Sequence, residues 1–176
     1  MGISTDSYAV SVGTDGQFTG AITHGGYPIF FKENCMHKVY GNYPANYQVQ
    51  TTACRGVQRG CKKSLAIVNE VLYYKSRSAI CAYDGSLPVE ISYALGDAYY
   101  FEAVAGALGN KYYISMKSEE DNEWYLFVFD ASKGMWHKED KTRADAFCSC
   151  NGEIYFIDHS DKKIKTLLGS GKKEPI

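Results

Sequence analysis

The sequence predicts an all-β fold of the β-propeller type, made of four blade-like antiparallel repeats in a single domain that spans residues 1–176. The first observation behind this prediction is a pattern that occurs four times, with turns about 41 to 45 residues apart, a period typical of propeller blades. The second is composition, because 15 Tyr and 8 Phe against 4 Pro suit a pleated, half-buried surface. The third is the near absence of helix signals along the chain.

Each repeat consists of a tight polar turn between two β-rich runs. The turns are built from residue types that favour hairpins, among them Gly and Asn. The four turns are His24-Gly25-Gly26, Asn69-Glu70, Gly109-Asn110-Lys111 and Asn151-Gly152-Glu153. The runs that follow them cover residues 28–31, 72–74, 112–114 and 154–157.

The second repeat shows the full plan of a blade, with strands expected at 64–68, 71–75, 79–83 and 88–92. Its last strand begins with Pro88, which an outer edge strand tolerates. The third repeat predicts strands at 101–108, 112–115, 124–129 and 135–137, and the fourth at 144–150, 154–157 and 164–169. The first is the least regular, with strands expected at 8–12, 18–23, 27–32 and 36–40. Four four-stranded antiparallel units are the expected outcome.

The ends of this array raise the question of closure, since open blades expose unpaired backbone groups. The edge strands expected near Tyr8 and Leu167 carry neither Pro nor dense charge. Four blades can close one small ring. The alternatives are pairing with a second copy, or membership of a larger ring of which this chain is a fragment. The cut-looking ends favour these alternatives over the small ring.

The overall composition argues against several partners. A net charge of -1 gives no global attraction to nucleic acid or to an anionic membrane. No apolar stretch approaches the roughly 20 residues needed to cross a bilayer, and the amino terminus lacks the features of a signal peptide. We therefore expect a protein that folds in a cytoplasm and binds neither membrane nor nucleic acid.

The cysteines and histidines do not form a metal-binding pattern. Cys148 and Cys150 stand two apart on one predicted strand, so both project to one face, where we expect small core residues. Zinc at Cys54, Cys61, Cys148 and Cys150 is the alternative, but no pair has the C-x2-C spacing of common structural sites. The histidines lie near turns and are expected at the surface: His24, His37, His137 and His159. No cofactor or metal is predicted.

One dense basic segment stands out, at residues 54–63. Its charged members are Arg55, Arg59, Lys62 and Lys63. With Gly56 and Gly60 among them, the segment predicts a loop that leads into an inner blade strand. It is a candidate contact for an acidic partner surface or for DNA, and its simpler interpretation is a solvated loop.

Residues 64–92 resemble the propeller repeat of bacteriophage minor structural and tail-associated proteins. The likeness lies in an apolar strand, Asn69-Glu70, an aromatic strand, a turn, a second apolar strand and the run Y-D-G-S-L-P-V-E-I-S at 83–92. Residues 103–115 and the F-D-x-x-x-G-x-W run at 129–136 are similar to the following blade of these proteins, and the resemblance covers about residues 20–170.

The resemblance implies a non-enzymatic component of a virion or prophage, structural or tail-associated, that binds other virion proteins and assembles in the cytoplasm of a bacterial host. A carbohydrate-binding propeller is the leading alternative, since exposed aromatic rings can stack on sugars. A glycoside hydrolase is the second, and it needs two carboxylates about 5 to 10 Å apart. Asp97, Glu102 and Asp145 are available for such a pair, but no spacing selects them.

Overall fold

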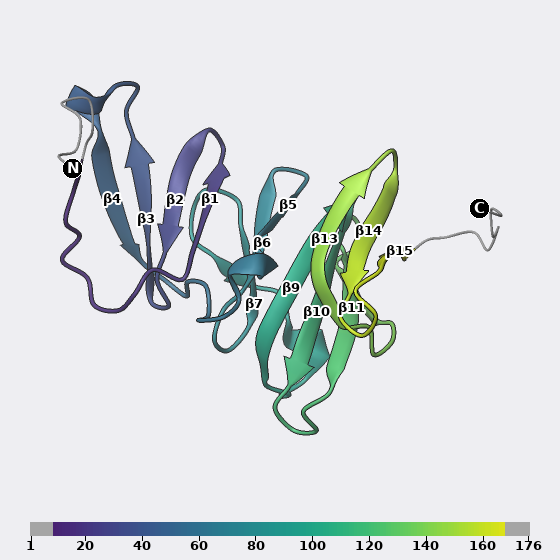
Figure 1. Ribbon diagram of the computed structural model, residues 1–176. Coiled ribbons are helices and arrows are strands. Elements are labelled where there is room, and N and C mark those ends of the chain that lie inside the picture. Colours follow the sequence, from purple (N-terminus) through teal and green to yellow (C-terminus); the bar gives the residue numbers. More distant parts are fainter. Residues whose placement is uncertain (1–8, 168–176) are drawn as a thin grey trace.

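The protein folds into four separate antiparallel sheets that follow one another along the chain (Figure 1). This computed structural model describes residues 9–167. Within that range the regular helix consists of three short 3-10 turns, at Pro44–Asn46, Lys62–Ser64 and Tyr93–Leu95. The all-β prediction is therefore confirmed. We call the sheets blades 1 to 4.

Blades 1 and 2 each contain four strands in sequence order. Blade 1 consists of β1 (Gly20–His24), β2 (Tyr27–Phe31), β3 (Cys35–Tyr40) and β4 (Gln48–Ala53). Blade 2 consists of β5 (Ala66–Val68), β6 (Val71–Lys75), β7 (Ile80–Tyr83) and β8 (Val89–Glu90). In blade 1 the expected strand at 8–12 is wrong over its described part, residues 9–12, and Tyr8 lies outside the described residues. Its place as a fourth strand is taken by β4, a Gln- and Thr-rich segment without an aromatic signal.

Blades 3 and 4 differ in size. Blade 3 consists of β9 (Tyr100–Leu108), β10 (Lys111–Ser118), β11 (Trp124–Asp130) and β12 (Met135–Lys138). Blade 4 consists of β13 (Ala144–Cys150), β14 (Glu153–Asp158) and β15 (Ile164–Thr166). Among the described residues blade 4 therefore has three strands, which corrects the expectation of four four-stranded units.

The four repeated turns all close the first hairpin of a blade. Asn69 and Glu70 have φ angles of 48° and 66°, and Asn151 and Gly152 have 51° and 79°. Two successive positive φ angles define the turn that matches the twist of a two-residue hairpin. The turn at Gly109-Asn110 has a positive φ at Gly109 only, which is the related turn with Gly in first position.

Blades 2, 3 and 4 pack face to face through their first strands, and β1 of blade 1 contacts the 3-10 turn Lys62–Ser64 that leads into blade 2. β9 lies against both β5 and β13, and the 3-10 turn Lys62–Ser64 packs on β1, β6 and β9. Figure 1 shows the blades as a fan, with blade 1 and blade 4 at opposite ends. The described residues thus form an open arc, and one small closed ring of four blades is not observed.

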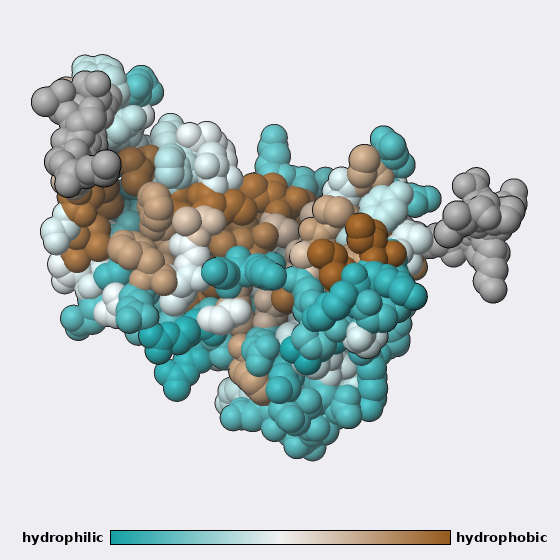
Figure 2. Space-filling view, in the orientation of Figure 1, coloured by the Kyte–Doolittle hydropathy of each residue, from teal (hydrophilic) through white to brown (hydrophobic). Residues whose placement is uncertain are grey.

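Aromatic side chains fill the space between blades. Phe31 of blade 1 contacts Tyr74 of blade 2, with ring centroids 5.0 Å apart. Tyr73 of blade 2 stacks on Tyr112 of blade 3 at 5.3 Å. One core cluster joins blades 1 to 3, whereas the cluster between blades 3 and 4 has only three buried members. Figure 2 shows the resulting apolar band across the middle of the molecule, with polar surface below it.

Two predictions about single residues are wrong. His24 and His37 are buried and hydrogen-bonded. His24 Nε2 donates to the Glu70 carbonyl oxygen of blade 2 at 2.6 Å, and the His37 ring bonds to the hydroxyl groups of Thr14 and Thr51. Cys148 and Cys150 are exposed, since no described segment covers the far face of blade 4. They do share one face, as strand geometry requires.

Candidate functional site: the loop face

One end of the arc gathers the connections between blades and the turns between the second and third strands. These segments meet because antiparallel strands alternate in direction, so the second strand of every blade and the fourth strand of blades 1 to 3 finish at the same end. We call this end the loop face; it is the lower end in Figure 1. Among the hollows that lie there, one extends over blades 1 to 3 and another over blades 3 and 4.

The larger hollow, which we call the central groove, has a volume of about 840 Å³. Its walls come from the β2–β3 turn, the segment after β4, the β6–β7 turn, the start of β9 and the β10–β11 turn. The lining residues are Glu33, Asn34, Cys54, Arg55, Gln58, Ser76, Arg77, Ser78, Tyr99, Tyr100, Phe101 and Glu119. Three blades must therefore be folded before this groove exists.

One wall of the groove is aromatic. Tyr99, Tyr100 and Phe101 follow one another at the entry to β9, and Tyr99 is 63% exposed. The Phe101 ring carries the Lys117 ammonium 5.1 Å from its centroid. The other lining residues carry guanidinium, amide and carboxylate groups, so the groove offers flat rings together with hydrogen-bonding groups.

A buried lysine, which does not itself line the groove, bonds to three residues that do. Lys75 is 3% exposed, and its ammonium donates to Gln58 Oε1 at 2.9 Å, to the Arg77 carbonyl at 3.3 Å and to the Ser76 carbonyl. Burial lowers the Lys75 pKa to about 8. The three oxygens favour the charged form and oppose this effect. The carbonyl cage ties the β6–β7 turn to residue 58 of the basic segment.

The basic segment 54–63 is a loop ahead of the inner strand β5, and its four cations are exposed but do not form a single patch. Arg55 forms an ion pair with Glu90, which raises its pKa through the hydrogen bond first and the charge second. Arg59 Nη2 donates to Gln17 Oε1 at 2.5 Å. Lys63 Nζ donates to the Asp145 carbonyl at 2.7 Å. Arg55 thus contacts blade 2, Arg59 the segment before blade 1 and Lys63 blade 4. Of the four cations of the segment, Arg55 alone lines the central groove.

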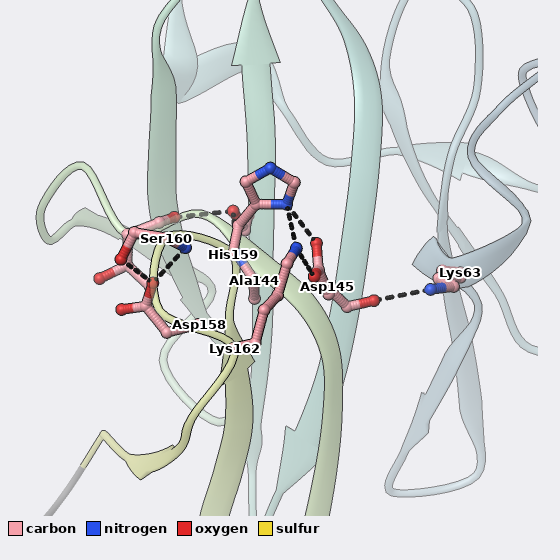
Figure 3. A network of polar contacts seen from close by, with 9 residues as sticks. Lys63, Ala144, Asp145, Asp158, His159, Ser160 and Lys162 are labelled. Carbon is pink, nitrogen blue, oxygen red and sulfur yellow. Dashed lines mark hydrogen bonds and ion pairs between the residues drawn. The ribbon is translucent and has the colours of Figure 1, made fainter.

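A second polar cluster lies beside the smaller hollow, which has a volume of about 350 Å³ (Figure 3). Asp145 accepts from His159 Nδ1 at 2.6 Å and from Lys162 Nζ at 2.7 Å. These two hydrogen bonds, the one from Lys162 first, lower the Asp145 pKa to about 2. Ser160 bonds to Asp158 instead of His159, so the cluster is not a serine–histidine–aspartate triad. It stabilises the entry to β13.

The carboxylates named for hydrolysis are placed apart from the central groove. Asp97 is in the connection before β9, Glu102 is on β9 and Asp145 is held by two cations. The two carboxylates that do line the groove are Glu33 and Glu119, which no sequence pattern marked. No sequence pattern marked Tyr99 either, because its exposure depends on how blades 2 and 3 meet.

Comparison with known proteins gives no family assignment. No protein-family model matches the chain, and no curated protein matches it. Among residues 9–167 no group of three or more Cys, His, Asp or Glu side chains is arranged to hold a metal ion. No helix in the same part of the chain is long and apolar enough to cross a membrane.

Proposed function

We propose that this chain is a non-enzymatic binding module of a phage or prophage virion, structural or tail-associated, that holds another virion protein during assembly. The likeness of residues 64–92 to phage propeller repeats supports the setting. The observation that carries the proposal is the central groove, which unites exposed Tyr99 and Arg77 over three blades. Tyr and Arg are the residues most often found at the energetic centres of protein interfaces.

The chemistry of the groove favours binding over catalysis. Its strongest polar groups already satisfy one another, as Arg55 pairs with Glu90 and Gln58 holds the Lys75 ammonium. A general acid or base needs a free group within hydrogen-bond reach of its substrate. The exposed Tyr99 and Arg77 are suited to contact a partner surface without such chemistry.

The test is incorporation into particles. Lysates after prophage induction are fractionated, and purified virions are analysed for this chain by mass spectrometry. We expect the wild-type chain in the virion fraction, and we expect Tyr99→Ala with Arg77→Ala to remove it while the variant remains folded. Val89→Ala, at an exposed apolar residue on β8 away from the groove, is the matched control. Absence of the wild-type chain from particles would contradict the proposal.

A carbohydrate-binding propeller is the second candidate, and the row Tyr99, Tyr100 and Phe101 favours it. Flat rings beside Asn34 and Gln58 offer stacking and hydrogen bonding to a sugar. Binding on a glycan array that Tyr99→Ala abolishes would support this function. Turnover of a chromogenic glycoside would instead support a hydrolase.

A further inference from the structure

Blades 2 and 3 each present one face to the blade before and one to the blade after, whereas blades 1 and 4 each have a neighbour on one face only. Successive residues of a strand point to opposite faces. The third residue of each second strand therefore faces the next blade, and the fourth faces the previous blade. The positions can be compared directly because each second strand follows a turn of two residues.

The third position of the second strand is tyrosine in blades 2, 3 and 4. Tyr73 is 5% exposed under blade 3, and Tyr113 is 3% exposed under blade 4. Tyr155, the third member, is half-buried and turns to solvent on the far face of blade 4. Its neighbours on that face include Ile157 and Ile164, which are 38% and 74% exposed. The far face of blade 4 thus has the composition of a buried blade face.

The fourth position of the second strand reveals an uncovered face on blade 1, at the other end of the arc. Tyr74, Ile114 and Phe156 are all at most 6% exposed, because each packs on the preceding blade. Phe30 holds this position in blade 1 and is 41% exposed. The Phe18 ring covers part of the Phe30 ring, with the two centroids 6.2 Å apart, and Phe18 is itself 56% exposed.

The first strands also carry residues that match the two sides of a contact between blades. Between blades 3 and 4, Gly106 of β9 meets Phe147 of β13 so closely that a Cβ at Gly106 would lie 2.4 Å from the Phe147 Cβ. Cys148 is the counterpart of Gly106 in blade 4, because it pairs with the third-position Tyr155 and Gly106 pairs with the third-position Tyr113. In the same way Ala21 is the counterpart of Phe147 in blade 1, because each pairs with the fourth-position residue of its blade, Phe30 and Phe156. Cys148 and Ala21, the counterparts of Gly106 and Phe147, are both exposed.

We infer that the far face of blade 4 packs on the free face of blade 1 in a second copy of this chain, so that two copies close one ring. The contact continues the packing already present between blades 1 and 2, 2 and 3, and 3 and 4. Each copy contributes four sheets, and two copies give a ring at the upper end of the roughly 4 to 8 blades typical of propellers. A two-fold ring buries both free faces of each copy. This inference is independent of the central groove and of any virion.

The first test is the mass in solution by light scattering during gel filtration. We expect twice the 19.6 kDa of the chain. Tyr155→Asp with Ile157→Asp places charge on the far face of blade 4 and should halve the mass without changing the circular dichroism spectrum. Val89→Asp, an exposed residue on β8, should leave the doubled mass unchanged. A wild-type monomer, or a ladder of larger species, would overturn the ring.

The second test reads the register. Ala21→Cys places a thiol opposite Cys148 of the other copy, and mild oxidation should convert the chain to a disulfide-linked dimer on a non-reducing gel. Disulfides form when the two Cβ atoms lie about 3.5 to 4.5 Å apart. The band should disappear when Cys148→Ser is added, and should not form with Ser86→Cys on the exposed β7–β8 turn. Doubled mass without this cross-link would refute the proposed register.

Discussion

At the scale of single residues, Lys75 shows how a buried polar group affects stability. A folded-state pKa of about 8 against an ordinary value of 10.5 means that the unfolded chain binds more protons between these two pH values. Stability contributed by this residue therefore rises with pH in that window, by at most about 3 kcal/mol. The thiols of Cys54 and Cys61 act in the opposite direction, because burial raises each pKa to about 11 and the native state then keeps its protons longer.

We expect the free energy of unfolding to rise from about pH 8 to pH 9 and to fall above it, as the two buried thiols begin to oppose Lys75. Lys75→Met should remove the rise and leave the fall. Urea unfolding at closely spaced pH values measures the free energy of unfolding of the wild-type protein and of Lys75→Met. A wild-type stability that declines steadily from pH 7 would show that the carbonyl cage keeps Lys75 fully charged.

Gly106 tests the fit between blades 3 and 4. A methyl group at this position would overlap Phe147, and the backbone of two packed strands would have to separate. Gly106→Ala should destabilise the protein by about 1 to 3 kcal/mol, the usual cost of overpacking. Gly13→Ala is the control, since Gly13 has open space around it and no positive φ, and it should be neutral. Thermal unfolding of the two variants gives the comparison.

At the scale of elements, the repeated turns explain why the first hairpin of every blade was predictable. Two-residue turns have strict backbone needs, and Gly and Asn satisfy them in the sequence itself. β4 was not predictable, because its Gln and Thr residues form a strand only through pairing with β3. The burial of His24 and the exposure of Cys148 depend on which blade lies alongside, and that information is not local.

Within the four repeated first-hairpin turns, Glu70 is the residue that departs from this preference. It holds a φ of 66°, which costs a residue with a side chain roughly 1 to 2 kcal/mol. Glu70→Gly should stabilise the protein by about 0.5 to 1 kcal/mol, after the greater freedom of Gly in the unfolded chain is subtracted. The reverse change in the fourth repeat, Gly152→Glu, should destabilise by a similar amount. Urea unfolding measures the change in the free energy of unfolding for each variant. Changes of the same sign in the two variants would contradict this account.

At the scale of the whole molecule, stability is distributed unevenly along the arc. The core cluster that joins blades 1 to 3 contains most of the buried aromatic and aliphatic side chains, whereas blades 3 and 4 share Tyr113, Val128 and Ile154. The main strand contacts between blades join neighbouring blades, so an end blade with a small interface can open without the others. The central groove lies over blades 1 to 3 and would survive that opening.

Amide hydrogen exchange should therefore show weaker protection in β14 than in β6 or β10. Phe147→Ala removes a ring that packs beside Ile154 and should lower protection in β14 while leaving β6 unchanged. If two copies close a ring, blade 4 gains a second covered face, and its protection should rise with protein concentration because association stabilises the closed state. β6, which lies between two blades in either case, serves as the internal control. Protection in β14 that is equal to that in β6 and independent of concentration would contradict both the weak end blade and its cover by a second copy.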